Sequence, residues 1–313
     1  MCESRVHTRS AKEPTKGSPL VFNQSMTRIK LRFTRPSRLP ITDLDYSVRD
    51  SLDIKQIMAE VVKVEYGAEA ANYDSFWTTG NAFVRLDSEL FISALGTSAA
   101  GASILDLAGG SGIKARFAIN AGAVAVDIVD LSQAMMREGQ KVEEGLNRNV
   151  IRWFEADISK PLDHLPLRPQ YDIVMAHWPL DHADSMEVLE GMLHNITSYL
   201  KPGGRFFGVR CCDPRAPAMV SGELGVVFKD FEEIPGGLKF RYAFDSAGSG
   251  TAIEATSMEA TYSGSTAIYE KFGLVDVQIE PYENAQVVKE NPKMWESFLR
   301  QPGLAMVKAT KKL

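Results

Sequence analysis

The sequence predicts an α/β fold with a doubly wound, mostly parallel sheet, and three observations support this. Short apolar runs fit for buried strands alternate with longer stretches of helical apolar spacing. Residues 104–115 combine such a run with a glycine turn and the start of a helix. A Leu-Lys-Pro-Gly-Gly step at 200–204 ends one predicted helix and starts another strand. Strand, helix and strand at this spacing imply right-handed parallel crossovers.

Length and composition are those of an ordinary globular protein and exclude several classes. The 313 residues suit one large α/β domain with extensions, and a net charge of −5 gives no general attraction to nucleic acid or anionic membranes. No apolar run approaches the roughly 18 residues of a membrane span. The three cysteines form no disulfide framework, so we expect a reducing compartment, the cytoplasm.

The amino-terminal part divides into two predicted segments. Residues 1–42 are basic and interrupted by prolines, which predicts a flexible arm; their Arg and Ser content leaves a mitochondrial presequence open. Residues 43–100 have helical apolar spacing at 51–66 and 81–95, and we expect them to form a helical cover. Residues 101–313 form the α/β domain.

Residues 104–115 carry the motif on which the functional prediction depends. Glycines at 109, 110 and 112 force a tight turn between a strand and a helix, an arrangement typical of nucleotide-type ligand sites. The stretch from Gly110 to Ala115 fits the dinucleotide pattern G-x-G-x-x-A. However, the Asp106 carboxylate at the strand end would repel a pyrophosphate. It suits a ligand with a cationic amino-acid tail, such as S-adenosylmethionine.

Four residues of this turn follow an ordered pattern. Asp106, Ala108, Gly110 and Gly112 match acidic-x-Gly-x-Gly-x-Gly, with alanine in place of the first glycine. The pattern resembles the first motif of the class I S-adenosylmethionine-dependent methyltransferases, as does the Leu-Lys-Pro-Gly-Gly step. The resemblance covers about residues 70–312. It implies a seven-stranded Rossmann-like sheet, S-adenosylmethionine as the cofactor, and these four residues at the cofactor.

A carboxylate also follows the next predicted strand, at 123–129. Asp130 is placed to hold two ribose hydroxyls, as an acidic residue after the second strand does in nucleotide-binding folds. Asp127 is the competing carboxylate, and a helix N-cap is the alternative role of Asp130. The Asp-Leu-Ser-Gln-Ala-Met sequence resembles the family's Asp-Leu-Ser-Pro-Glu-Met, which implies that Leu131 and Met135 also lie at the cofactor.

Further cofactor candidates come mainly from the resemblance. Asp157 and Ile158 follow the predicted strand 150–155, where the family places an Asp against the adenine amino group and an apolar neighbour against the ring. A turn-forming role before Pro161 is the alternative for Asp157. Tyr73 lies near the junction of the leading helices and is either a cofactor cover or a packing residue.

The segment after the fourth predicted strand, 171–176, carries the candidate catalytic residues. We expect His177 to touch the cofactor and His182 to act as general base if the acceptor is a hydroxyl. Asp181 would orient His182 or contact the substrate. Packing or capping is the alternative for both histidines. No metal is expected, because the two histidines lack a coherent third ligand.

Residues 178–183, 272–277 and 294–299 resemble segments of the small-molecule methyltransferases grouped with toxoflavin synthase. This resemblance implies methyl transfer to an O or N atom of a small-molecule acceptor. Residues 211–262 break the alternation of strands and helices. They predict strands or a hairpin inserted over the site, which would shape the acceptor pocket.

Two other functions stay open: an enzyme of this fold that catalyses an isomerisation or cyclisation, and a cofactor-binding regulatory protein. Asp106 and the Leu-Lys-Pro-Gly-Gly step argue against an NAD-dependent oxidoreductase. We expect a monomer or weak homodimer without a nucleic-acid or membrane partner.

Overall fold

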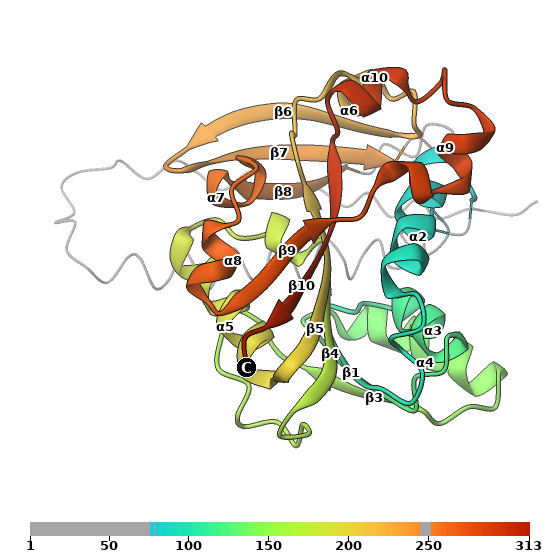
Figure 1. Cartoon of the computed structure of the whole chain (residues 1–313), viewed down its shortest axis with the longest axis vertical. Helices are drawn as coiled ribbons and strands as arrows, with labels where there is room; N and C mark the ends of the chain where they lie inside the picture. Colours follow the sequence, from blue (N-terminus) through green and yellow to red (C-terminus); the bar gives the residue numbers. More distant parts are fainter. Residues whose placement is uncertain (1–75, 78, 245–251) are drawn as a thin grey trace, which may run out of the picture. The chain divides into compact units, whose positions relative to one another are not determined.

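A seven-stranded sheet forms the centre of the molecule (Figure 1). The computed structural model describes residues 76–77, 79–244 and 252–313. The strand order is β3-β2-β1-β4-β5-β10-β9; the first five strands run parallel, and β10 is antiparallel to both of its neighbours. The strands are β1 Ser103–Leu107, β2 Ala125–Asp130, β3 Ile151–Glu155, β4 Tyr171–His177, β5 Leu200–Cys211, β9 Leu274–Ile279 and β10 Leu304–Lys311. The predicted doubly wound, mostly parallel sheet is confirmed.

Helices cover both faces of this sheet. Successive β1 residues point to opposite faces: Ile104 packs in the core cluster of α2 and α3, and Leu105 in that of α5. Both are fully buried, as expected for a parallel strand between two helical layers. The longer helices are α2 Ala82–Leu95, α3 Ile113–Asn120, α4 Gln133–Gly145 and α5 Met186–Tyr199.

Within 211–262, three strands form a second, antiparallel sheet of order β6-β7-β8. Its strands are β6 Val226–Ile234, β7 Gly237–Phe244 and β8 Ala252–Met258, preceded by α6 Pro217–Ser221. Figure 1 shows this sheet (orange) beyond the carboxyl end of β5. A backbone bridge between His182 and Thr256 attaches β8 to the segment after β4. The inserted sheet therefore borders the edge where open α/β sheets bind ligands.

The sequence predicts a strand at 251–262 and helices at 263–272 and 291–299, and the bounds of all three differ in the structure. The predicted strand 251–262 ends at Met258, and its last residues form α7 Glu259–Tyr262. The predicted helix 263–272 shortens to α8 Ala267–Lys271, after Gly264 takes a φ of 80°. The predicted helix 291–299 is replaced by turns and then α10 Glu296–Arg300, because the buried Trp295 indole donates a hydrogen bond to the Val287 carbonyl of α9 Gln286–Glu290 (3.0 Å).

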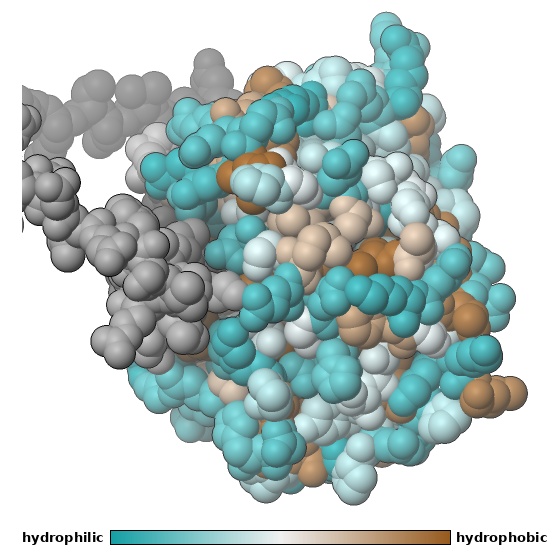
Figure 2. All heavy atoms as spheres, turned by 90° about the vertical axis from the view of Figure 1, so that its left-hand side faces the viewer, coloured by the Kyte–Doolittle hydropathy of each residue, from teal (hydrophilic) through white to brown (hydrophobic). Residues whose placement is uncertain are grey.

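Several predictions lie outside the described residues: the arm 1–42, the helix at 51–66 and Tyr73. In the part that the structure describes, no helix is both long and apolar enough to cross a membrane. On the face in Figure 2, hydrophilic residues predominate and apolar residues occur in small groups. Apolar residues scattered in this way are normal for a protein surface.

Candidate active site

The turn between β1 and α3 brings the backbone close to the Asp106 side chain. Ala108, Gly110 and Gly112 all have positive φ, of 58°, 53° and 78°. Ala108 therefore adopts the left-handed conformation at the position where the family pattern has glycine. A Cβ added at Gly109 would lie 2.8 Å from the Asp106 carboxylate. This close approach requires glycine at 109, which the sequence placed in the turn but not among the cofactor residues.

Asp106 is buried with an unsatisfied oxygen. The residue is 1% exposed, and its Oδ2 has no hydrogen-bond partner. Burial raises its pKa to about 8, the negative charge of Asp130 adds to this, and the charge of Lys114 opposes it. A buried polar atom without a partner is costly, so the site fits a ligand that brings a donor. A cationic amino group meets that need and would favour the ionised carboxylate.

Asp130 links the glycine turn to the end of β2. Its Oδ2 accepts a hydrogen bond from Gly110 N, and its Oδ1 accepts one from Ser132 N, both at 2.7 Å. Burial raises its pKa to about 6, against the lowering effect of these two bonds. The N-cap of α4 is Ser132, whose Oγ accepts from Met135 N (3.3 Å). The structure therefore assigns the capping role considered for Asp130 to its neighbour.

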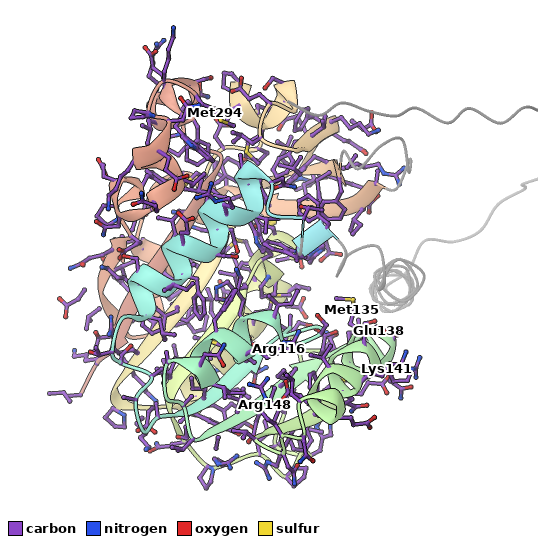
Figure 3. All side chains as sticks on the ribbon, turned by 90° about the vertical axis from the view of Figure 1, so that its right-hand side faces the viewer. Arg116, Met135, Glu138, Lys141, Arg148 and Met294 are labelled. Atoms are coloured by element: carbon purple, nitrogen blue, oxygen red, sulfur yellow. The ribbon has the colours of Figure 1, made fainter. Side chains whose placement is uncertain are left out.

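Met135 lies beside the same turn, at the start of α4 (Figure 3). Its Cε would be 3.2 Å from a Cβ at Gly110. Leu131, half-buried, lies between Asp130 and the helix. The structure thus brings together the turn, Asp130 and Met135, all predicted cofactor residues.

Asp127, the competing carboxylate, is occupied elsewhere. It is fully buried and accepts hydrogen bonds from Arg152 Nε and Arg168 Nη1, each at 2.7 Å, and from the Tyr171 hydroxyl. Burial alone would raise its pKa, but these partners outweigh it, so the pKa lies below the usual value. The carboxylate holds β2, β3 and β4 together, which supports the choice of Asp130.

Asp157 and Ile158 follow β3, next to the end of β2. Ala156 N donates to the Asp130 carbonyl (3.1 Å), which places this segment beside the β2 end. The Asp157 Oδ1 accepts from Ser159 N (2.8 Å), so the turn-forming interaction considered for Asp157 is present. Ile158 is buried in the core cluster on the α5 side. The adenine-binding role of both residues stays a prediction.

His177 ends β4 in an apolar environment. Both ring nitrogens are buried without a hydrogen-bond partner, and the ring meets the Phe91 ring edge-on at 4.7 Å. Burial, helped by the charge of Lys114, lowers its pKa well below 6.5. The imidazole is therefore neutral at pH 7 and presents unused donor and acceptor positions.

A buried ion pair, which sequence reasoning missed, connects this region to the helical cover. Lys114 of α3 pairs with Asp87 of α2, and its Nζ also donates to Ser88 Oγ (3.1 Å). The Trp178 indole donates to the other Asp87 oxygen (3.2 Å), and the Lys114 ammonium lies 5.0 Å from the Trp77 ring centroid. The available signal was a single charge on the apolar face of the predicted helix 81–95.

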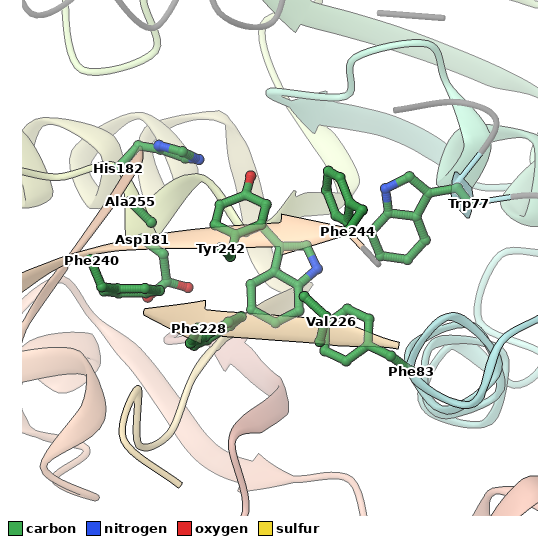
Figure 4. A pocket seen from close by; sticks show the side chains of 11 residues that line it. Trp77, Phe83, Asp181, His182, Val226, Phe228, Phe240, Tyr242, Phe244 and Ala255 are labelled. Atoms are coloured by element: carbon green, nitrogen blue, oxygen red, sulfur yellow. The ribbon is translucent and has the colours of Figure 1, made fainter. Parts of the chain in front are cut away.

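A pocket opens beside His182 and contains about 430 Å³ of space, counted to its open mouth (Figure 4). Residues from α2, β6, β7, β8 and the segment after β4 line it. Most of the lining is aromatic: Trp77, Phe83, Trp178, Phe228, Phe240, Tyr242 and Phe244. Its apolar, aromatic lining is typical of a small-molecule site.

Asp181 and His182 are the non-aromatic polar side chain and the histidine of this lining. Asp181 is buried at the end of the 3-10 helix η1 Pro179–Asp181 and accepts hydrogen bonds from Cys211 N (2.8 Å) and the Ser257 hydroxyl. Burial raises its pKa to about 6, against these bonds. The carboxylate therefore fixes η1 against β5 and β8, a structural role that the sequence did not predict. The predicted contact of Asp181 with His182 or with substrate stays a prediction.

His182 is half-buried, and burial lowers its pKa to about 4. The ring is therefore neutral at pH 7 and able to accept a proton. Among the described residues, no cluster of three or more His, Cys, Asp or Glu side chains could hold a metal ion.

Comparison with known proteins identifies the domain. Residues 104–204 match the family model described as a methyltransferase domain. No curated protein sequence matches significantly. The fold is shared with a S-adenosylmethionine-dependent methyltransferase from Clostridium acetobutylicum: 14% identity, 79% of this chain and 99% of that chain covered, TM-score 0.54.

Two other solved structures share the fold. One is the 1,6-didemethyltoxoflavin-N1-methyltransferase from Burkholderia thailandensis, solved with 1,6-didemethyltoxoflavin and S-adenosylhomocysteine: 15% identity, 87% and 94% coverage, TM-score 0.50. The other is the DhpI–SAM–HEP complex: 18% identity, 81% and 96% coverage, TM-score 0.52. The match over residues 104–204 agrees with the predicted methyltransferase class, and two of these solved structures contain S-adenosylmethionine or S-adenosylhomocysteine.

Proposed function

We propose that this protein transfers a methyl group from S-adenosylmethionine to an O or N atom of a small molecule bound in the aromatic pocket. The observation that carries the proposal is that Asp87 contacts both the helix after the glycine turn and the wall of the pocket. One of its oxygens pairs with Lys114, directly after the glycine turn, and the other accepts from Trp178 in the pocket wall. A donor site at the turn and an acceptor site in the pocket would thus be neighbours.

The residues around the turn fit the donor. Asp106 offers an unpartnered buried oxygen to the amino group, and Asp130 a carboxylate to the ribose. Gly110 and Gly112 keep the turn free of side chains, and Asp157 with Ile158 follows the next strand. When bound, S-adenosylmethionine supplies an activated methyl group. The protein's main task is then to align donor and acceptor, since orientation alone removes much of the barrier.

His182 would serve a hydroxyl acceptor. Its neutral imidazole lines the pocket and can take the hydroxyl proton. An amine acceptor with a free lone pair needs no such base. The Burkholderia enzyme of the same fold is named as an N1-methyltransferase of a small molecule, which supports a small-molecule acceptor here.

Incubation with methyl-labelled S-adenosylmethionine and a metabolite extract from the source organism tests the proposal. We expect label in a small organic product and none in protein or nucleic acid. Cofactor binding with an unlabelled rearranged product would favour isomerisation or cyclisation instead. Calorimetry that detects NAD binding but no S-adenosylhomocysteine binding would contradict the donor assignment.

We propose a cytoplasmic location and a monomeric or weakly dimeric state. The composition and the three cysteines support the location. Gel filtration with light scattering checks the oligomeric state.

A further inference from the structure

The walls of the acceptor pocket are suited to a flat guest. The Phe83 and Trp178 rings lie 5.7 Å apart and are tilted by 30°; the Phe228 and Phe240 rings lie 4.9 Å apart and are tilted by 31°. Tyr242, from the middle strand of the inserted sheet, lines the same space. Aromatic faces attract other aromatic rings through their quadrupoles, by about 0.5–1.5 kcal/mol per pair beyond area burial.

The pocket offers no compensation for an anionic guest. Asp181 is the charged side chain among its described lining residues, and its carboxylate already binds Cys211 N and Ser257. Lys114 approaches the Trp77 ring but is paired with Asp87, and Arg210, close enough to Asp181 to affect its pKa, does not line the pocket. Burial of an anionic group here would cost free energy without a partner.

His182 and Asp181 lie together at one end of the pocket. Figure 4 shows the His182 ring and the Asp181 carboxylate on one side, and Trp77, Phe83 and Phe244 on the other. A guest with one hydrogen-bonding group would therefore be oriented with that group toward His182.

We infer that the acceptor is a planar aromatic molecule that carries no anionic group and whose hydroxyl or ring N–H faces His182. The inference rests on the proposed function, because it specifies the substrate class of that site. It excludes phosphorylated and carboxylated metabolites and saturated alcohols as preferred acceptors.

Binding to the protein saturated with S-adenosylhomocysteine tests this class without any need for turnover. Three probes share one ten-carbon skeleton: 2-naphthol, its saturated counterpart decahydro-2-naphthol, and the anionic 2-naphthoate with one added carboxyl carbon. We expect 2-naphthol to bind at least tenfold more tightly than either of the others, by calorimetry or by quenching of Trp77 and Trp178 fluorescence. Equal or tighter binding of the saturated alcohol or of the carboxylate would overturn the inference, and so would the binding of no probe.

Variants of the inserted sheet sharpen the test. Tyr242→Leu, at a half-buried position, should weaken 2-naphthol binding at least fivefold with unchanged S-adenosylhomocysteine affinity, and Tyr242→Phe should restore it. The matched control is Phe231→Leu: Phe231 is half-buried in the same sheet but does not line the pocket. Equal losses in Tyr242→Leu and the control would contradict the inference. Aromatic binding without methyl transfer to any acceptor would instead reject only the proposed function.

Discussion

Asp106, Asp127 and Asp130 lie within two neighbouring strands, and their surroundings give each a different role. Asp106 is buried with an oxygen that has no partner, which makes it available to a ligand. Asp127 has its oxygens committed to two arginines and a tyrosine. Asp130 holds two backbone amides, one of them in the glycine turn. Substitution of Asp130 should therefore weaken ligand binding, whereas substitution of Asp127 should lower the stability of the fold.

We expect Asp130→Ala to weaken S-adenosylhomocysteine binding by about 1–3 kcal/mol, the cost of losing hydrogen bonds to a charged group. Asp127→Ala should leave affinity nearly unchanged but lower the free energy of unfolding by about 1–3 kcal/mol, because the buried Tyr171 hydroxyl loses its acceptor. Calorimetry and urea unfolding separate the two effects. The reverse pattern would show that Asp127 is the ribose ligand.

The affinity for S-adenosylhomocysteine should rise with pH between about 6 and 8. Asp106 has a pKa of about 8 in the ligand-free protein, and a cationic amino group binds its ionised form. One linked proton gives at most about a tenfold change per pH unit. Burial lowers the pKa of His182 to about 4 and that of His177 well below 6.5, and Asp130, with its pKa raised to about 6, titrates at the lower end of this range.

The effect on stability has the opposite sign. The raised pKa means that the folded, ligand-free protein holds this proton more tightly than the unfolded chain. The contribution of Asp106 is therefore full below pH 4 and is lost as the pH rises toward 8. Asp106→Asn should flatten the pH dependence of affinity and weaken binding; a retained slope would assign it to another group, with Asp130 examined next.

His182→Ala should lower turnover while cofactor affinity stays within about 1 kcal/mol. For a hydroxyl acceptor the loss of the base should be on the order of 10²–10⁴-fold in kcat. For an amine acceptor the loss should be small and mostly in KM. Steady-state kinetics with the identified acceptor distinguishes the two. Unchanged kinetics with a hydroxyl acceptor would remove His182 from the mechanism.

At the residue scale, the sequence predicted contacts that are local along the chain. Asp106 and Asp130 lie at strand ends and the glycine turn follows one, and strand ends can be recognised from apolar runs. The Lys114–Asp87 pair and the aromatic pocket depend on how distant segments pack, so no local pattern contains them. Asp181 was predicted at the site, but its bonds to Cys211 and Ser257 required the fold of the inserted sheet.

At the scale of elements, α4 packs directly on the glycine turn. An added Cβ at Gly139 would lie 2.3 Å from the Ser111 carbonyl oxygen and 2.4 Å from the Trp153 ring. Arg116 donates to the same carbonyl (2.8 Å) and approaches Glu143 of α4 at 3.8 Å. The helix therefore helps to hold the turn in its shape.

Gly139→Ala should displace α4 from the turn. We expect a loss of roughly 1–3 kcal/mol in the free energy of unfolding, typical of overpacking, and several-fold weaker S-adenosylhomocysteine binding. Gly145→Ala, in the same helix, meets nothing within 4 Å and should stabilise the protein by about 0.4–1 kcal/mol with unchanged affinity. Thermal unfolding and calorimetry measure both; equal behaviour of the two variants would contradict this role of α4.

The parallel strands and the longer helices were predicted within a few residues because their apolar spacing is long and regular. The short helices near the carboxyl terminus were predicted poorly. Around Trp295, tertiary burial decides the conformation: its indole bonds to the Val287 carbonyl, and turns replace the expected helix. Periodicity over so few residues does not contain that information.

At the scale of the whole molecule, the described residues contain both parts of the proposed site. The donor turn, the strand ends and the aromatic pocket all lie between Phe76 and Met258. The segment 1–42 contributes none of these residues.

Removal of residues 1–42 should leave the melting temperature and the S-adenosylhomocysteine affinity nearly unchanged. The basic, proline-interrupted composition of this segment motivates the expectation. Thermal unfolding and calorimetry of the truncated and full chains make the comparison. An insoluble truncated protein, or one without cofactor binding, would show that the segment packs onto the domain.

The inserted sheet has a consequence for how this protein can diversify. Its strands pair only with one another in the described chain, apart from the single bridge between Thr256 and His182. Much of the pocket wall is thus encoded in one stretch, 226–258, and the donor residues in an earlier one. Sequence changes within that stretch can alter which acceptor is bound while the donor-binding residues stay the same. Proteins descended from one ancestor can therefore use the same methyl donor and different acceptors.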